Sequence, residues 1–258
     1  MTSIWNKIPR FARTVFVLAF WIFIWWIISV CVNQEVLVPS PAEVSRRLLE
    51  LIQTKEFYTT VLNSVLRIIS GFLYATVAGV LLGILAARIS LLDELISPLL
   101  SLVKATPVAS FIILALVWID KQLIPSFISF LMVFPIIHGN VSTGLKNTPY
   151  ELIEMAKIYH FSFRHKITKL YFPAVFPYFA AGFKTALGLS WKAGVAAEVL
   201  CFPKNSIGKE LYEAKTYLET IDVFAWTVTI VVISVLIEKV LMWLVEKIQK
   251  NRKERKCV

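Results

Sequence analysis

Residues 151–173 read ELIEMAKIYHFSFRHKITKLYFP, a charged segment between two long apolar runs. Six of its side chains are ionised at neutral pH, so the segment is too polar to enter the hydrocarbon of a membrane. Its spacing of apolar and charged residues is typical of short helices. It therefore indicates a helical connection that lies outside the bilayer, and the rest of the chain has to be organised around it.

The composition around this segment is that of a membrane protein. Hydrophobic residues make up 57% of the 258 residues and charged residues 17%, and the mean hydropathy is +0.70. The apolar residues occur in runs close to the ~20 residues that a helix needs to cross about 30 Å of hydrocarbon. These features predict an all-α polytopic membrane protein, with residues 1–258 forming a single transmembrane domain.

The apolar runs predict about six transmembrane helices and both termini in the cytoplasm. An even number of spans puts the two ends on one side, and the basic segments NKIPRFAR and KIQKNRKERKCV mark that side as cytoplasmic. The first run lacks a cleavage site and is interpreted as a retained span. Residues 88–125 contain Pro98, Pro107 and Pro125, so RISLLDELISP is alternatively a short interfacial helix. The predicted spans are 14–32, 61–87, 100–119, 123–139, 174–199 and 222–246.

Several function classes are disfavoured. The net charge of +10 comes largely from cations beside the spans, which argues against nucleic acid as a partner. The three cysteines have no metal-binding spacing, and no G-x-x-x-x-G-K-[ST] phosphate loop occurs. No catalytic residues, no metal and no cofactor are expected on this chain.

The polar connection contains two predicted helix starts. Thr148 is expected as an N-cap, with Pro149 at the first helical position and Glu151 completing a capping box. Leu152, Ala156, Tyr159 and Phe163 then form one apolar stripe. Ser162 offers a second start after a turn near His160. On pattern alone, the hairpin is either a docking element or a surface loop whose basic face meets anionic lipid headgroups.

The predicted outer loop starts with LVPSPAEVSRRLLELI, where Ser40 or Pro41 begins an amphipathic helix. This helix either lies on the membrane surface or docks an external partner. In the second span, Gly79 and Gly83 form a G-x-x-x-G pair that predicts close packing of helices.

The segment from Glu154 to Pro173 resembles the cytoplasmic EAA loop of ATP-binding-cassette importer permeases, whose pattern is E-A-A-x3-G-x9-I-x-L-P. Its continuation, PAVFPYFAAGFKTALGLSWKAGVAAEVL, is similar to the following span in the nitrate, sulfonate and taurine branch of that family, and LVPSPAEV is similar to its outer loop. Two positions depart from the pattern of the motif. His160 replaces a glycine at a turn that can require positive φ, and Met155 and Phe172 replace smaller or aliphatic residues.

The resemblance implies a type I importer permease in a bacterial cytoplasmic membrane, with coupling helices at about 148–172. The implied partners are separate ATPase subunits that hold ATP and Mg²⁺, a second permease copy forming a homodimer, an extracytoplasmic substrate-binding protein and the lipid bilayer. The expected cargo is a small polar or anionic solute such as a sulfonate, taurine or nitrate; the alternatives are a heterocyclic vitamin precursor, such as a thiamine pyrimidine or riboflavin-like compound, and an autonomous secondary transporter. The residues assigned to ATPase coupling are Glu151, Glu154, Met155, Ala156, Tyr159, His160 and Phe163.

Ionisable residues inside spans are costly and are candidates for function. Lys184, Gly188 and Lys192 are spaced by four and share one helix face, which we interpret as a cationic wall of the translocation pathway. Glu198 is expected to pair with another span as part of a gate. The remaining pathway candidates are Arg67 and Trp191. The alternative is that the charged side chains extend towards the membrane surfaces.

Overall fold

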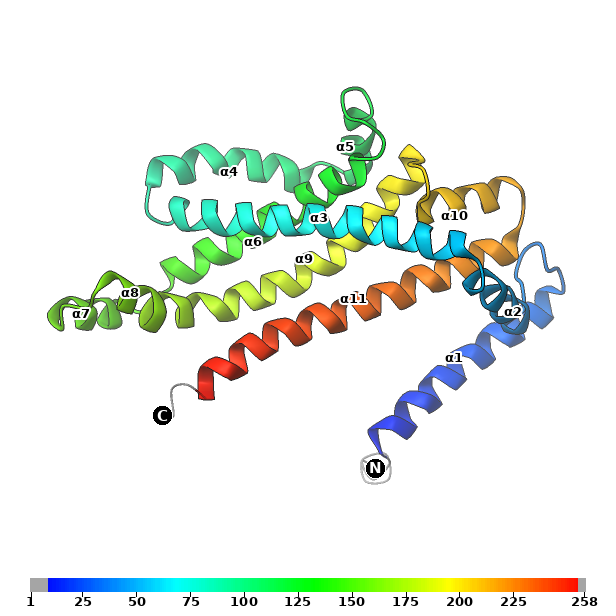
Figure 1. The fold of residues 1–258 in the computed structure, drawn as a ribbon, viewed down its shortest axis with the longest axis horizontal. Helices are drawn as coiled ribbons and strands as arrows, with labels where there is room; N and C mark the ends of the chain where they lie inside the picture. The colour runs from blue at the N-terminus through cyan, green and yellow to red at the C-terminus, as the bar shows by residue number, and fades with distance from the viewer. Residues whose placement is uncertain (1–8, 255–258) are drawn as a thin grey trace. The chain divides into compact units, whose positions relative to one another are not determined.

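The computed structural model describes residues 9–254, and helices account for most of that range (Figure 1). Within it, the predicted all-α fold is confirmed. In chain order the helices are α1 (Arg10–Val32), α2 (Pro41–Ile52), α3 (Lys55–Ala86), α4 (Ser90–Ala105), α5 (Val108–Ala115), α6 (Ile124–Lys146), α7 (Tyr150–Ile158), α8 (Phe163–His165), the π-helical turn η2 (Lys166–Tyr171), α9 (Phe172–Cys201), α10 (Ile207–Thr216) and α11 (Thr220–Glu254).

The chain divides into two compact units. The smaller unit consists of residues 1–59 and 210–230, and the larger unit of residues 60–209 and 231–258. Helices α3, α10 and α11 each pass from one unit into the other.

In the smaller unit, α2 begins as predicted at Ser40, with Pro41 as its first residue. The Ser40 hydroxyl accepts a hydrogen bond from the Glu43 amide, and the Glu43 carboxylate accepts one from the Ser40 amide, which completes a capping box. Hydrogen bonds from Ser40 lower the pKa of the Glu43 carboxyl. On the same helix, the guanidinium of Arg47 binds both carboxylate oxygens of Asp222, at 2.5 and 2.8 Å. The carboxylate of Asp222 holds the pKa of Arg47 above its usual range.

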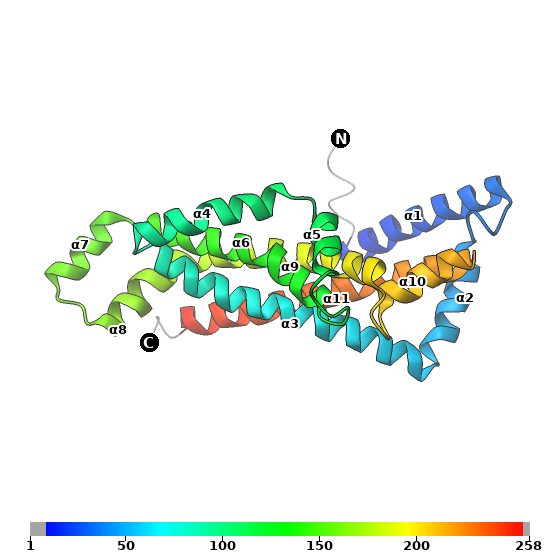
Figure 2. The same cartoon turned by 90° about the horizontal axis from the view of Figure 1, so that it is seen from above.

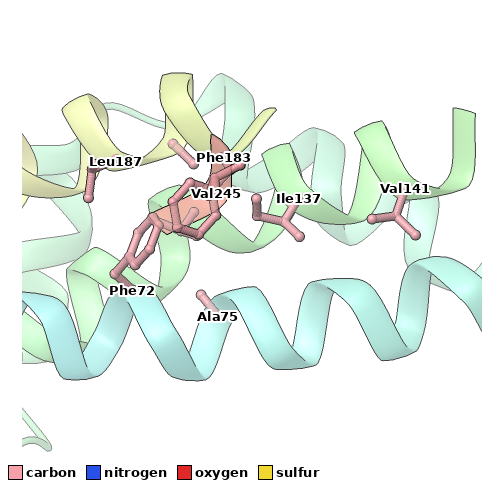
Figure 3. Close-up of a cluster of buried hydrophobic side chains, with 9 residues drawn as sticks. Phe72, Ala75, Ile137, Val141, Phe183, Leu187 and Val245 are labelled. Carbon is pink, nitrogen blue, oxygen red and sulfur yellow. The ribbon is translucent and has the colours of Figure 1, made fainter. Parts of the chain in front are cut away.

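The larger unit is built around α6 and α9, which pack along each other (Figure 1, Figure 2). Its core joins side chains from α3, α6, α9 and α11 (Figure 3). The rings of Phe72 and Phe183 meet edge to face with centroids 4.9 Å apart, an arrangement worth about 0.5–1.5 kcal/mol beyond the buried area. The labelled members of this cluster are Phe72, Ala75, Ile137, Val141, Phe183, Leu187 and Val245.

Glycines bring the backbones of α3 and α6 together. A Cβ atom added at Gly79 would lie 2.9 Å from Cβ of Ile137, and one added at Gly83 would lie 2.9 Å from the carbonyl oxygen of His138. The predicted packing role of this glycine pair is confirmed. Gly71, which the motif did not include, is tighter still, since a Cβ there would lie 2.0 Å from the carbonyl oxygen of Ser126. Such close approach of backbones is how helices associate where lipid removes the hydrophobic driving force.

Among the described residues, four helices, α1, α3, α6 and α11, contain stretches long and apolar enough to cross a membrane, and α4 with α5 would make a fifth if the bent pair forms one span. The predicted span at 100–119 is not one continuous helix, because the chain bends by 101° between α4 and α5. The bend falls at Thr106 and Pro107, where Thr106 has an extended backbone, as residues before proline prefer. RISLLDELISP likewise does not form a separate short helix, since α4 continues through Pro98 to Ala105. Helix α9 has 30 residues but is not in this apolar set.

The fourth predicted span is also longer than expected. Helix α6 continues to Lys146, so His138 is not at its end but inside it, and is only 3% exposed. The basic segments used to orient the termini lie partly at residues 1–8 and 255–258, outside the described residues.

Candidate functional site

The polar connection forms a helical hairpin at one end of the larger unit (Figure 2). Helix α7 ends in a Schellman motif, in which the amide of Phe161 binds the carbonyl of Ala156 and the amide of His160 binds the carbonyl of Lys157. His160 occupies the left-handed position with φ of 45°. Its predicted positive φ is confirmed, and it explains why a glycine suits this place in the EAA pattern.

Of the two predicted helix starts, the one at Ser162 is confirmed and the one at Thr148 is wrong. The Ser162 hydroxyl caps α8 by accepting a hydrogen bond from the His165 amide. By contrast, Thr148 does not cap α7. Its amide and hydroxyl bind carbonyls of Leu145 and Gly144, so it closes α6, and α7 begins after Pro149 without a side-chain cap.

Most of the predicted apolar stripe faces outward. Ala156 is 1% exposed, but Tyr159 and Phe163 are 72% and 66% exposed. The predicted stripe is therefore not a buried face of the hairpin. Large apolar side chains held at the surface by short helices are typical of a binding surface. Of the other residues assigned to coupling, Glu151, Glu154, Met155 and His160 are exposed.

The hairpin leads into α9 through the π-helical turn η2, where the amide of Phe172 binds the carbonyl of Ile167. Pro173 and Pro177 follow directly, and each lacks an amide hydrogen for the helical ladder. Because the helical segments follow one another without an interruption, the hairpin is attached directly to the helix that carries most of the pathway candidates.

The middle of α9 has an open face. Lys184 and Lys192 are both exposed, and a Cβ added at Gly188 would meet nothing within 4 Å. Lys184 lies 3.5 Å from Glu238 of α11, an ion pair that is 61% and 45% exposed and therefore worth little. The sequence reasoning missed this acidic partner. Trp191 is 3% exposed, so it does not share the open face of its neighbour Lys192.

At the other end of α9, Glu198 is completely buried and is bound to α3 and α10. Its Oε2 accepts hydrogen bonds from the Ser64 hydroxyl at 2.8 Å and from the Gly208 amide at 3.2 Å. The same Ser64 oxygen accepts the amide of Ile207 at 2.9 Å. The predicted contact of Glu198 with another span is thereby confirmed. We call Ser64, Arg67, Glu198 and Gly208 the carboxylate cluster.

Arg67 connects this cluster to the loop after α9. Its Nη1 lies 3.7 Å from Oε1 of Glu198, an oxygen with no hydrogen-bond partner among the described residues. Arg67 also donates to the backbone carbonyls of Lys204 and Asn205 and to the side chain of Gln122. The guanidinium thus fastens loop 202–206 to α3. Sequence reasoning missed Ser64 and Gly208, although Ser64 lies three residues before Arg67 and so on a neighbouring helix face.

Within residues 9–254, no three His, Cys, Asp or Glu side chains are grouped to hold a metal ion. The apolar helices define a multi-pass membrane protein that presents an exposed hairpin and a charged helix, α9.

The sequence profile of the family described as "Binding-protein-dependent transport system inner membrane component" matches residues 79–254, and the chain belongs to this family. Over 237 residues, which cover 90% of this chain and 84% of the relative, it is 26% identical to SsuC of Bacillus subtilis, an aliphatic sulfonates transport permease. It is 26% identical to the bicarbonate transport system permease CmpB of Synechococcus elongatus, covering 76% of this chain and 71% of CmpB. It is also 33% identical to the nitrate import permease NrtB of Leptolyngbya laminosa, over 53% of this chain and 50% of NrtB.

The resemblance to importer permeases is therefore confirmed. The chain is a multi-pass transport subunit of the inner-membrane component family and not itself an enzyme. Membership implies that a binding protein and ATPase subunits complete the transport system. The roles of individual residues within it remain predictions.

Proposed function

We propose that this permease imports a small oxyanion, working as a homodimer with two ATPase subunits, which would bind ATP and Mg²⁺, and an extracytoplasmic binding protein. The observation that carries the proposal is the open face formed by Lys184, Gly188 and Lys192 on α9. Lys184 is paired with Glu238, so the cation that this face offers to a solute is Lys192. Its charge is complementary to the three anions, sulfonate, bicarbonate and nitrate, for which the relatives above are named. None of these three relatives is named for a heterocyclic vitamin precursor.

In this proposal the hairpin contacts the ATPase and transmits its conformational change to the membrane helices. Tyr159 and Phe163 present apolar surface for a groove on the ATPase, flanked by Glu151 and Glu154. Met155 adds a contact beside them, whereas the buried Ala156 and the turn at His160 hold the two short helices in position. With both termini in the cytoplasm, the hairpin also lies there.

Transport then alternates between two rigid-body arrangements of the permease copies. The carboxylate cluster lies at the opposite end of α9 and serves as part of an outer gate. The carboxyl group of Glu198 is held by helix α3, and the guanidinium of Arg67 is held by loop 202–206. Opening this end would require several of these hydrogen bonds to rearrange together.

The test is uptake by proteoliposomes that contain the permease, its co-expressed ATPase and binding protein, and ATP inside or outside in separate preparations. We expect ATP-dependent accumulation of one of nitrate, bicarbonate or an alkyl sulfonate on the side that holds ATP. Accumulation under an ion gradient without ATPase would contradict the proposal and favour a secondary transporter.

The charge of the open face is tested by Lys192→Gln. Loss of one cation facing an anion is expected to raise the half-saturating substrate concentration or slow uptake by about tenfold, roughly the effect of one charge-assisted hydrogen bond. Lys204→Gln is the matched control, because Lys204 is exposed and uses only its backbone carbonyl in the loop. Equal uptake by the unmodified protein, Lys192→Gln and Lys204→Gln would show that Lys192 does not contact the transported anion.

A further inference from the structure

The larger unit contains a cavity beside the hairpin, and Phe163 is the only one of its lining residues to which the transport proposal gives a role. It has a volume of about 460 Å³, within the range of about 300–1,000 Å³ that is usual for sites of small organic ligands. The side chains around it come from α3 and the turn that follows it, α6, α8, η2 and α9, and only one of them is charged. They are Val80, Ile84, Arg88, Val141, Leu145, Phe163, Ile167, Tyr171, Phe172, Val175, Phe176 and Phe179.

One wall of the cavity is aromatic. Phe172 and Phe176 stack with ring centroids 5.3 Å apart, and Phe179 continues the row at 6.4 Å from Phe176. The spacings of four and three residues place these rings on one face of α9. Val80 and Ile84, also spaced by four, contribute aliphatic side chains from α3. A flexible hydrocarbon chain fits such a wall better than a polar solute does.

The charged member, Arg88, lies just beyond the end of α3 and is exposed. Among the described residues it forms no ion pair, and the same is true of Arg164, Lys166 and Lys169 in the neighbouring α8 and η2. The acid that follows Arg88 most closely in sequence, Asp93, is held by Lys146 at 2.6 Å. The hairpin end of the cavity therefore carries positive charge that the described chain does not neutralise.

We propose that the cavity binds an anionic phospholipid, with an acyl chain along the aromatic wall and the phosphate at Arg88. The cavity lies where spanning helices meet a polar connection, so a lipid of the same leaflet can enter it without leaving the membrane. A free oxyanion would use Arg88 but leave the hydrocarbon wall uncovered. A second copy of this chain would cover the wall, but it would also have to bring an acidic group to Arg88.

The bound lipid would support the coupling hairpin from behind. Phe163 and Ile167 line the cavity, although they belong to the segment that leads out of the hairpin turn. An acyl chain in the cavity therefore contacts both the hairpin and α3. The headgroup class would then affect how well ATP hydrolysis is coupled to transport.

The experiment quantifies lipids that remain bound after the intact transporter complex is purified in mild detergent. Ile84→Trp fills the cavity, Arg88→Gln removes its cation, and Arg46→Gln is the control for loss of an exposed arginine, since the Arg46 side chain is 85% exposed and belongs to the smaller unit. We expect anionic phospholipid to be retained by the unmodified protein and by Arg46→Gln. Retention should fall about fivefold in Arg88→Gln, the change that roughly one cation near a lipid headgroup produces. It should also fall in Ile84→Trp, because the indole occupies the space of the acyl chain.

Arg88→Gln keeps the test decisive if Ile84→Trp fails to fold, because the Arg88 side chain is at the surface. A second readout is ATPase coupling in vesicles of phosphatidylcholine with or without phosphatidylglycerol, where only the unmodified protein and Arg46→Gln should respond to the anionic lipid. The proposal would be overturned if all four proteins retained the same amount of anionic lipid. It would also be overturned if the unmodified protein retained as much zwitterionic as anionic lipid. A disulfide between the Ile84→Cys residues of two permease copies would show that a second copy, and not a lipid, covers the cavity.

Discussion

The two ends of helix α9 are built in opposite ways. At its beginning, the hairpin holds Tyr159 and Phe163 more than half exposed, and an open cavity lies beside it. At its end, the carboxylate of Glu198 is fully buried and hydrogen-bonded to two other segments of the chain. The same helix therefore joins a surface that the described part of the chain leaves uncovered to a cluster whose hydrogen-bond partners lie within the larger unit.

This difference separates residues that stabilise the permease from residues that couple it to other subunits. A buried charge contributes to stability only while its partners remain in place, so changes at the far end should unfold the protein. Exposed apolar side chains contribute little to the stability of the chain alone. Changes in the hairpin should instead alter the response to the ATPase.

The largest effect on stability is expected for Glu198→Leu. The substitution leaves the Ser64 hydroxyl and the Gly208 amide without their acceptor and removes the acidic group 3.7 Å from Arg67, which keeps its hydrogen bonds to Gln122, Lys204 and Asn205. We expect the free energy of unfolding to fall by about 3–5 kcal/mol, the cost of removing one member of a buried ionic group. The measurement is an SDS titration in mixed micelles.

Glu198→Gln is the control for this change, because its amide oxygen can still accept from Ser64 and Gly208. Its free energy of unfolding should fall by less than that of the leucine variant. A leucine variant as stable as the unmodified protein would show that the carboxylate cluster adds nothing to stability. The two ends of α9 would then not differ in their contribution to stability.

A smaller effect is expected for Gly208→Ala. A Cβ atom at this position would lie 2.5 Å from Cβ of Glu198 and 2.5 Å from the amide nitrogen of Val199. Backbone has to move to accept it, at a cost of about 1–3 kcal/mol. Gly188→Ala is the matched control, since nothing lies within 4 Å of its Cβ position, and alanine favours a helix. Equal stabilities of the two variants, measured by the same titration, would contradict the close packing at Gly208.

A local gain is expected for His160→Gly. The left-handed backbone at His160, with φ of 45°, is strained for a side chain with a Cβ atom. Glycine removes this strain but loses more entropy on folding, so the net gain is about 0.5 kcal/mol. Hydrogen exchange of the Phe161 amide, which binds the Ala156 carbonyl, reports it. Tyr159→Gly is the control. In this variant the Phe161 amide should exchange faster than in the unmodified protein, because Tyr159 has a φ of −81° that needs no glycine.

The smallest effect on stability is expected for Tyr159→Ser, less than about 0.5 kcal/mol, because the side chain is 72% exposed. Stimulation of the ATPase by the loaded binding protein should nevertheless fall by about tenfold, as for loss of an interface anchor. Tyr217→Ser is the matched control, with a tyrosine that is 73% exposed in the smaller unit. If Tyr159→Ser destabilised the chain but left the ATPase response intact, the hairpin would be a structural element and not a coupling surface.

Much of the fold could be predicted because membrane insertion imposes simple patterns. Apolar runs located α1, α3, α6, α9 and α11, and local capping rules located Ser40 and Ser162. The errors occurred where neighbouring elements compete for one residue. Thr148 has the chemistry of an N-cap, but α6 continues far enough to use its hydroxyl at the preceding turn. The bend between α4 and α5 falls at Pro107, which the sequence marked as an interruption, but proline alone did not predict a turn of 101° because both sides of it are apolar.

The candidate site divides in the same way. Helical spacing placed Lys184, Gly188 and Lys192 on one face without knowledge of any other helix. The partners of Glu198 and of Lys184 required the tertiary structure, since Ser64 and Glu238 lie 134 and 54 residues from them along the chain (198 − 64; 238 − 184). Exposure of Tyr159 and Phe163 was also not predictable, because the stripe pattern does not reveal whether an apolar face is covered by its own chain.

The glycine contact between α3 and α6 has a consequence for how the protein is made. Gly71, Gly79 and Gly83 fit only against α6, but residues 87–123 are synthesised before α6 begins. At about 5–20 residues per second, the ribosome needs about two to seven seconds for this interval. During that time the glycine surface of a newly inserted α3 faces lipid or the insertion machinery. Assembly of the larger unit therefore depends on α3 remaining unassociated until α6 has entered the membrane.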